Sequence, residues 1–384
     1  MIARIFSCFL GSFVANGLAR FGYIVLIPLM ILEGGLSQTQ SIMLGIAILV
    51  GYIFGSIFIN LLKEHLSLES IAKVSFFIIA LSFFACALPD MPFAWAFIWR
   101  FLAGGASASL MILVAPLCVP YVKANLRASV SGLVFSGIGL GAVFSGFVLP
   151  LVSKYHLNYA WVLLGLIALF AFIWSLFTLK TLNPAQKNKN ENKKFKISYF
   201  LWLLVISYSL NAIAYLPHTL FWADFLVRDL NFDIILAGAS WAFFGIGAVF
   251  GSLGSGILGD KIGFKNAHII VLLLKALSCL IAGFYFVFLQ DFLLSALNVS
   301  VFLMGFTTTG NVVLTNAMAL EIVGKEYFSQ SSSFLTLAFG VFQAVFSFAF
   351  TYSLHWTDYA TLFNICVILH ILSALVLLPI KKHS

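Results

Sequence analysis

Long apolar runs separated by short polar breaks follow one another along the whole chain. Twelve of these runs are near or above the roughly 20 residues that a helix needs to cross the hydrocarbon core of a bilayer. The period-2 alternation of a membrane β-barrel is missing, and a helix is the other structure that satisfies every backbone polar group in lipid. The predicted spans cover residues 4–32, 39–62, 70–88, 93–119, 127–152, 158–180, 198–227, 234–258, 266–289, 293–320, 328–353 and 359–380.

The composition agrees with this pattern. Of 384 residues, 62% are apolar and 9% are charged, whereas soluble domains carry about 25% charged residues. The first run is too long for the apolar core of a signal peptide and contains Arg20, so we expect it to remain as a membrane span. The five cysteines all lie in apolar runs without a C-x-x-C pair, which predicts neither disulfides nor a metal site. The sequence therefore predicts an all-α, multi-pass membrane protein.

Basic residues are concentrated on one side of the predicted topology. Twelve spans put both termini on the same side, and sixteen of the 21 Lys and Arg residues fall in segments on that side. Only Lys154 and Arg228 fall on the opposite side, and three lie within spans. The positive-inside rule then predicts cytoplasmic termini in the plasma membrane, the inner membrane of a bacterium. The net charge of +8 reflects this topology beside anionic lipid, and gives no reason to expect a nucleic-acid partner.

An internal repeat divides the chain into two halves. The one long polar break, rich in Lys and Asn, covers residues 183–197 and predicts a cytoplasmic linker between six-helix bundles at 1–182 and 198–384. Short similar segments recur in the same order in both halves, at offsets of 195 to 201 residues. They are N-G-L-A (16–19) with N-A-I-A (211–214), F-G-S (54–56) with F-G-S (250–252), F-L-A-G (101–104) with F-L-M-G (302–305), and Y-A (159–160) with Y-A (359–360). Six spans per half give both repeats the same orientation, as in parallel-repeat transporters.

Polar residues at mid-membrane depth are concentrated in the first, fourth, seventh and tenth spans. Within each span they recur at three- and four-residue intervals, which places them on one helix face. The stripes contain Asn16, Arg20 and Tyr23; Arg100, Gly104, Ser107 and Met111; Tyr208, Asn211, Tyr215, His218 and Trp222; and Met304, Thr308, Asn311 and Thr315. Such residues commonly hydrogen-bond one helix to another. Because four stripes lie on repeat-related spans and two contain an arginine, we favour a shared water-filled cavity.

The two arginines of these stripes indicate the chemistry of a substrate. A cation at this depth costs at least about a few kcal/mol and must face protein or water. The guanidinium fork matches a carboxylate, phosphate or sulfonate, whereas a structural arginine would pair with a buried acid. Nearly all acids fall in loops or at span ends, and the deepest, Asp224, lies four residues before Arg228, with which we expect it to pair. Backbone carbonyls, tyrosine hydroxyls or a substrate anion would have to serve as the partners of the two arginines. We favour an anionic substrate, with purely structural arginines as the alternative. The predicted binding residues are Asn16, Arg20, Tyr23, Arg100, Tyr208, Asn211, Tyr215, His218, Thr308, Asn311 and Thr315.

His218 is the predicted site of proton coupling, because imidazole titrates near neutral pH. It follows Pro217, which removes a backbone hydrogen bond and favours a kink. A ligand for substrate and a satisfied buried imidazole are the two alternative roles. Lys275 lies about two turns into the ninth span, where we expect its long side chain to extend toward the cytoplasm. Glycines of the fifth span, including Gly137 and Gly141, allow close helix approach, either for sliding against the other half or for static packing.

Four local motifs resemble those of one family. The segment G-I-L-G-D-K-I-G-F-K at 256–265 resembles the signature G-x-x-x-D-R/K-x-G-R/K-R/K of the major facilitator superfamily, with Phe264 as the departure. G-L-A-R-F-G-Y-x-x-x-x-P in the first span, W-R-F-L-A-G-G-A-S-A in the fourth and F-S-G-I-G-L-G in the fifth are similar to its YbfB/YjiJ-type branch. The resemblance implies two six-helix bundles, the major facilitator fold. It also implies a cytoplasmic gate that closes and opens with the transport cycle, at Asp260, Lys261, Gly263 and Lys265.

The sequence and this resemblance together predict a secondary transporter that works by alternating access on a small organic anion, coupled to protons. We expect no cofactor, no enzymatic activity, a monomer and membrane lipid as partner. No G-x-x-x-x-G-K-S/T loop for ATP is present, so a gradient must supply the energy. Export of amphipathic or cationic compounds is the alternative, although mid-membrane carboxylates are nearly absent. A scaffold protein would need a soluble appendage, and an intramembrane enzyme an acid/base pair or H-E-x-x-H site; neither is present.

Overall fold

The computed structural model describes residues 1–89, 91–123, 127–180, 198–288 and 290–380. Helices account for nearly all of these residues, and no strand occurs among them. Within these ranges, eleven helical segments are long and apolar enough to cross a membrane, and Tyr199–Ala214 begins a twelfth, broken segment. Most ends lie within four residues of the predicted ones; the ninth span stops six residues early, at Gly283.

The first half contains six spans. The first is one continuous run, Ile2–Leu32, in which the helical parameters change twice. Its parts are α1 (Ile2–Ser12), the π-helix η1 (Phe13–Gly22) and α2 (Tyr23–Leu32). The others are α3 (Gln38–His65), α4 (Leu68–Cys86), α5 (Phe93–Cys118, followed by the 3-10 turn η2, Val119–Tyr121), α6 (Arg127–Ser153) and α7 (Leu157–Thr178).

The second half begins with the broken span. Pro217 lacks a backbone N–H and its ring would clash with the carbonyl four residues earlier, and the helix is interrupted at Tyr215 and Phe221. Its pieces are α8 (Tyr199–Ala214), α9 (Leu216–Leu220), α10 (Trp222–Asp224) and η4 (Phe225–Asp229). The remaining elements are α11 (Ile234–Ile262), α12 (Phe264–Gly283), η5 (Tyr285–Val287), α13 (Gln290–Ser353, divided into two spans at Gly324) and α14 (Tyr359–Val376).

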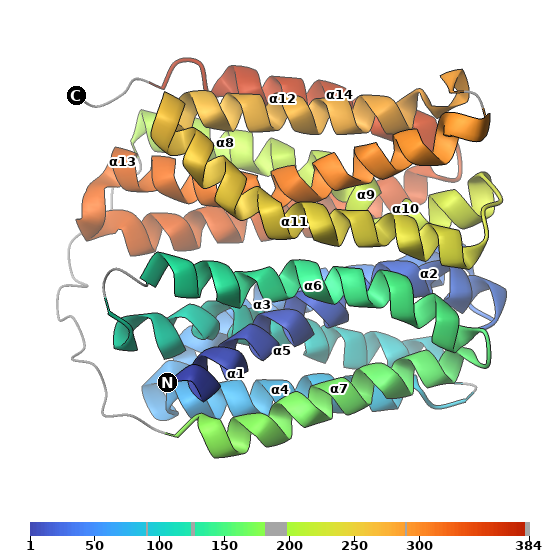
Figure 1. Ribbon diagram of the computed structural model, residues 1–384, viewed down its shortest axis with the longest axis horizontal. Helices are drawn as coiled ribbons and strands as arrows, with labels where there is room; N and C mark the ends of the chain where they lie inside the picture. Colours follow the sequence, from blue (N-terminus) through green and yellow to red (C-terminus); the bar gives the residue numbers. More distant parts are fainter. Residues whose placement is uncertain (90, 124–126, 181–197, 289, 381–384) are drawn as a thin grey trace.

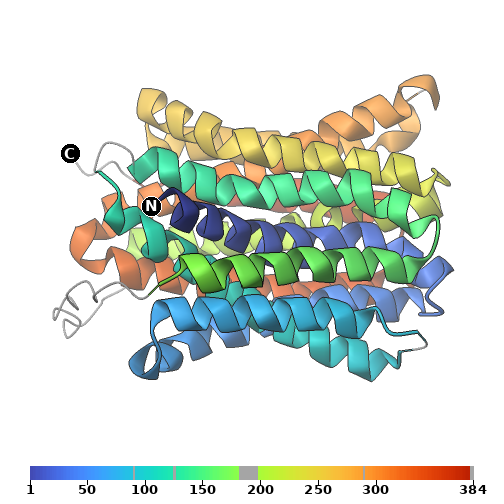
Figure 2. The ribbon, with the colours of Figure 1, turned by 60° about the horizontal axis from the view of Figure 1, so that its bottom comes forward.

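All spans run roughly along one axis, with the helices of the two halves in separate layers (Figure 1). A turned view shows the same bundle from another side (Figure 2). Both chain ends lie at one end of the bundle, which we call the terminal end. The opposite end, which holds the turns at 33–37, 154–156, 230–233 and 354–358, is the distal end. The predicted linker at 183–197 lies outside the described residues.

The internal repeat is visible in the packing of two helix pairs. In the first half α3 packs against α5, and a methyl group added at Gly51 would lie 2.0 Å from the carbonyl oxygen of Phe101. In the second half α11 packs against α13, and a methyl group at Gly247 would lie 2.2 Å from the carbonyl oxygen of Phe302. These four residues are related by the offsets of 196 and 201 found in the sequence. Glycine is required because backbone meets backbone.

Helix α6 uses its glycines on two faces. A methyl group at Gly141 would lie 2.5 Å from Gly17 Cα of the first span, within the same half. A methyl group at Gly146 would lie 2.4 Å from the carbonyl oxygen of Gly238 in α11, which belongs to the other half. The fifth span therefore combines close packing inside its own bundle with a close contact to the opposite bundle.

The contact between α6 and α11 loosens toward the terminal end. Near that end, a methyl group at Gly132 would meet only a side-chain carbon of Leu253, at 3.9 Å. Figure 1 shows α11 running away from α6 toward the terminal end. The two bundles are thus closest at the centre and in the distal half.

Candidate substrate-binding site

Arg20 lies at the meeting point of the two halves. It is in the last turn of η1 and remains half-buried. Its Nη2 donates a hydrogen bond to the hydroxyl of Tyr215, and its guanidinium carbon lies 5.1 Å from the centroid of the Phe21 ring. The two bonded residues occupy equivalent positions of the repeat, 195 residues apart. π-Helical turns are rare and frequent at functional sites.

The Tyr215 hydroxyl accepts hydrogen bonds from two elements, η1 and α13. Tyr215 sits where α8 ends, at the interruption caused by Pro217. Gln343 of α13 donates its amide to the same oxygen that Arg20 contacts. Accepting twice leaves the tyrosine O–H itself as a donor. Charged and neutral donors therefore converge on one point.

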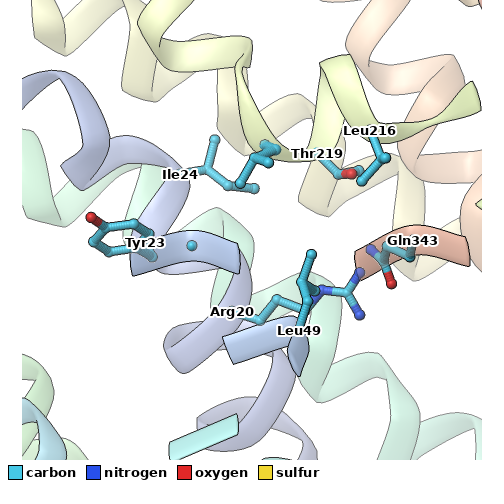
Figure 3. A pocket seen from close by; sticks show the side chains of 9 residues that line it. Arg20, Tyr23, Ile24, Leu49, Leu216, Thr219 and Gln343 are labelled. Carbon is cyan, nitrogen blue, oxygen red and sulfur yellow. The ribbon is translucent and has the colours of Figure 1, made fainter. Parts of the chain in front are cut away.

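A small cavity lies beside this contact. It holds about 10 Å³, the room of about one water. Both halves line it: Arg20 and Tyr23 come from the first span, whereas Thr219 and Gln343 come from the second half (Figure 3). The Tyr23 hydroxyl donates to the carbonyl oxygen of Ser41 at 2.7 Å. Of the predicted site, Arg20 and Tyr23 thus line this small cavity, and Tyr215 lies beside it through its hydrogen bonds with Arg20 and Gln343.

Arg100 lies inside the first bundle. It is 1% exposed, and its guanidinium carbon is 4.2 Å from the ring centroid of Tyr23 and 5.7 Å from that of Trp161. Its Nη2 donates to the carbonyl oxygen of Ala19 at 2.8 Å, and its Nε and Nη1 have no partner among the described residues. Aromatic faces stabilise this cation where an acid was sought. Asn16, on the same face as Arg20, is also buried, with its side-chain oxygen unpartnered among the described groups.

The stripe of the seventh span faces several neighbours. Asn211 accepts a hydrogen bond of 2.8 Å from Lys275 Nζ, and Tyr208 packs on Phe339 with 4.6 Å between ring centroids. His218 Nε2 lies 2.9 Å from Ser300 Oγ, and its ring stacks on Trp222 at 4.9 Å. His218 is therefore enclosed in the second bundle, behind the cavity.

The residues of the tenth span bond mainly within their own helix. Thr315 Oγ1 donates to Asn311 Oδ1 at 3.2 Å, and both residues are buried. Thr308 is half-buried, with a hydroxyl that has no partner in the described part of the chain. None of the three lines the cavity beside Arg20.

A polar cluster joins the halves at the distal end. Asp224 accepts hydrogen bonds from Gln38 of α3, at 3.0 Å, and from the hydroxyl of Tyr359 in α14. The expected pair with Arg228 is present but longer, at 3.5 Å. Gln38 belongs to the first half and the other three to the second. We call Gln38, Asp224 and Tyr359 the distal cluster.

The signature segment lies at the terminal end. Asp260 and Lys261 are exposed, and Asp260 forms no hydrogen bond or ion pair with any described residue. Gly263 joins α11 to α12 with a φ of 85°, in the left-handed region that favours glycine. Lys265 Nζ donates to the carbonyl oxygens of Leu378 at 2.8 Å and Ile380 at 2.9 Å, which follow α14.

Sequence reasoning missed three contributors to these sites. Gln343 is a single amide within an apolar run, and this isolation was the available signal, whereas Gln38 stands in a polar segment beside Gln40 and carried none. Lys275 was expected to extend toward the cytoplasm, but it is 1% exposed and turns inward to Asn211. Whether Lys275 reaches the cytoplasm or a neighbouring helix depends on the face of α12 that carries it. The depth of a residue along its helix does not give that face.

A comparison with family models matches residues 12–378 to the family described as uncharacterised MFS-type transporter YbfB. The chain belongs to this family. The match confirms the resemblance carried by the motifs of the first, fourth and fifth spans. A search of curated proteins finds no match.

Solved structures agree in fold. A peptide transporter POT, in complex with sulfate, is 12% identical, with a TM-score of 0.76 over 98% of this chain and 93% of that one. A mutant form of the nucleoside transporter NupG is 13% identical, with a TM-score of 0.78 over 97% of this chain and 98% of that one. The prediction of the major facilitator fold is thereby confirmed. This MFS-type chain is a multi-pass membrane protein built for secondary transport.

Proposed function

We propose that this YbfB-type transporter moves a small organic anion by alternating access and that Arg20 binds the anionic group. The observation that carries the proposal is the pairing of Arg20. It is a permanent cation at the junction of the halves, and its hydrogen-bond partner among the described residues is a neutral hydroxyl. A guanidinium has five N–H donors, so most of them remain for an anion. The Tyr215 hydroxyl offers one more.

Arg100, which lies inside the first bundle, also favours a negatively charged substrate through its own positive charge. It stacks on Tyr23, which lines the cavity. In a low-dielectric interior a second fixed cation without a described acid partner adds to the positive potential at the cavity. We therefore propose that Arg100 adds to the positive electrostatic potential of the site and that Arg20 contacts the anion directly.

Several features support a conformation that is closed at the distal end. The distal cluster links the halves there, and α6 meets α11 closely at Gly146. At the terminal end the same helices separate, and Asp260 is unpaired among the described residues. With the termini in the cytoplasm, as the Lys and Arg distribution predicts, this is a state opening inward. The cavity is water-sized, so an entering anion must part Arg20 from Tyr215.

The remaining parts of the proposal follow from the predicted topology. The protein would act as a monomer among inner-membrane lipids, with protons as the coupling ion. Asn16 and Thr308 carry unpartnered oxygens within the described set, and they would take up hydrogen bonds to substrate once the halves move. Asn211, Asn311 and Thr315 are already bonded within the second half and would first have to exchange partners.

The proposal can be tested by thermal shift on the purified full-length protein. The probes are acetate, lactate, succinate, benzoate, methanesulfonate and inorganic phosphate. We expect at least one to raise the melting temperature of wild type and to lose most of that effect in Arg20→Ala. Lys154→Ala, which removes an exposed cation at the distal end, is the control and should respond like wild type. A screen in which only amphipathic cations stabilise the wild type would instead favour export of such compounds and end the anion proposal.

A further inference from the structure

Lys275 is a buried cation that the predicted site did not include. It lies in α12, is 1% exposed, and donates from Nζ to Asn211 Oδ1 at 2.8 Å. Its Nζ also lies 4.9 Å from the ring centroid of Tyr215. Neither described ion pair of the chain involves it. It therefore resembles Arg20 in lacking an acid partner among the described residues.

The titratable groups around Lys275 are not carboxylates. Among the described residues, they are Tyr215 at the end of α8, His218 in α9, His268 and Cys279 in α12 itself, and His370 in α14. The other helices that pack on α12, which are α11 and α13, add no carboxylate to this group within the described ranges. Any negative charge that balances Lys275 must come from outside this set.

Lys275 and Arg20 contact the same tyrosine from two sides. Lys275 faces the ring, whereas Arg20 binds the hydroxyl. An arginine keeps its charge, but a lysine can release its proton when it is buried. We propose that Lys275 carries the proton coupled to transport, and that anion binding at Arg20 and protonation of Lys275 favour each other. The inference rests on the proposed function and assigns its coupling residue.

Electrostatics gives the sign of this coupling. An anion at Arg20 lies close to Lys275 across a medium of low dielectric, so it stabilises the ammonium form. Linkage is reciprocal, and the proton on Lys275 raises the affinity for the anion by the same factor. Anion and proton then cross together, as in symport. After the proton leaves, the neutral amine still donates to Asn211, which keeps the side chain in position.

His218 is the competing candidate within the same bundle. Its Nε2 is bonded to Ser300 and its ring is stacked on Trp222. These contacts hold it one turn beyond Tyr215, with no described bond to the residues that contact Arg20. His218→Gln therefore serves as the matched control for Lys275.

The test measures proton uptake upon anion binding. Purified full-length protein in weak buffer near neutral pH with a pH-indicator dye receives acetate, lactate, benzoate or methanesulfonate, the probes of the thermal-shift screen that stay fully ionised there. We expect wild type and His218→Gln to take up protons when the anion binds. The affinity of wild type for the anion should fall by up to about tenfold for each unit by which the pH rises, the limit for one linked proton. Lys275→Met should still bind the anion through Arg20, without proton uptake and without pH dependence.

A second variant keeps the test decisive if Lys275→Met fails to fold. Lys275→Arg retains the cation and a donor for Asn211, and it should bind the anion without taking up a proton. Proton uptake that persists in either Lys275 variant overturns the coupling role while leaving anion transport intact. Absence of any anion binding by wild type overturns both, and the two failures are thereby distinguished.

Discussion

The two mid-membrane arginines differ in what surrounds them. Arg100 is enclosed by the faces of Tyr23 and Trp161 and by a backbone carbonyl, whereas Arg20 meets a hydroxyl of the other bundle. The contact of Arg20 breaks when the bundles move apart. Breaking the contacts of Arg100 would instead open the packed interior of the first bundle. Arg20 is therefore the arginine able to change partners during a transport cycle.

Removing the Tyr215 hydroxyl tests this contact. Tyr215→Phe leaves Arg20 and Gln343 without their shared acceptor, and a lost acceptor in a buried site costs about 1–3 kcal/mol. Tyr208→Phe is the control on the same helix, because Tyr208 is held by ring packing on Phe339. Melting of the detergent-purified variants should show a clear loss of stability for Tyr215→Phe alone. Equal shifts would mean that the hydroxyl contact contributes nothing.

The sequence predicted which residues are deep but not what they touch. Arg20 and Arg100 were found because charge is rare in apolar runs. The search for an acid partner of Arg100 found none. A backbone carbonyl, one of the expected alternatives, and two aromatic rings, which were not expected, supply the stabilisation. The contact of Arg20 with Tyr215 depends on how two helices from different halves face each other, which no local pattern encodes.

At the scale of elements, α6 works as a shared helix between the bundles. Gly141 faces its own bundle and Gly146 faces α11. We expect Gly146→Ala to push the distal ends of the bundles apart, because the added methyl group would meet a backbone carbonyl. Gly141→Ala should lower the melting temperature of the protein and leave the distal spacing unchanged.

Spin labels at the distal end measure this spacing. Cysteines placed at Tyr155 in the first half and Trp356 in the second are suitable, because both positions are exposed. The five native cysteines are buried and free. Pulsed EPR should report a longer distance in Gly146→Ala than in wild type. A longer label-to-label distance in Gly141→Ala but not in Gly146→Ala would contradict the assignment of Gly141 to packing within its own bundle and of Gly146 to the contact with α11.

The positions of the elements were the most predictable part of the fold. Apolar runs fix the spans, since about 20 residues must be satisfied as helix in lipid. Pro217 indicated a kink, and the structure has two interruptions there. The π-helical stretch of the first span had no sequence signal. It coincides with the close approach of Gly17 to α6.

At the scale of the whole molecule, we expect the distal cluster to favour the conformation that is closed at the distal end. Gln38→Leu removes both hydrogen bonds that the Gln38 amide donates to the second half, to Asp224 at 3.0 Å and to the Tyr359 hydroxyl at 3.1 Å. It leaves the Asp224–Tyr359 bond within the second half. A hydrogen bond to a carboxylate contributes about 1.5–3 kcal/mol, so the distal-closed population should fall by roughly ten- to a hundredfold relative to the distal-open one.

The same pair of spin labels reads out this shift. Arg228→Gln is the matched control, because it removes a neighbour of the same carboxylate from within one bundle. We expect a second, longer distance population in Gln38→Leu only. An unchanged distribution would show that the cluster does not hold the bundles together.

The overall architecture could be predicted because the halves repeat. The offsets of 195 to 201 residues predicted equivalent spans, and the glycine contacts of α3 with α5 and of α11 with α13 are indeed equivalent. The conformational state could not be predicted. It depends on contacts such as that between Gln38 and Asp224, 186 residues apart, whose energy is small beside that of the fold.

The helix α11 is longer than the hydrocarbon core of a bilayer is thick. Its 29 residues extend about 43 Å at 1.5 Å per residue, against a hydrocarbon thickness of about 30 Å. Tilting relieves such a mismatch, and α11 leans away from α6 toward the terminal end (Figure 1). If α11 uprights and closes toward α6 as one motion, we expect a thicker membrane to narrow the opening at the terminal end. Lipid chain length would then influence the transport rate.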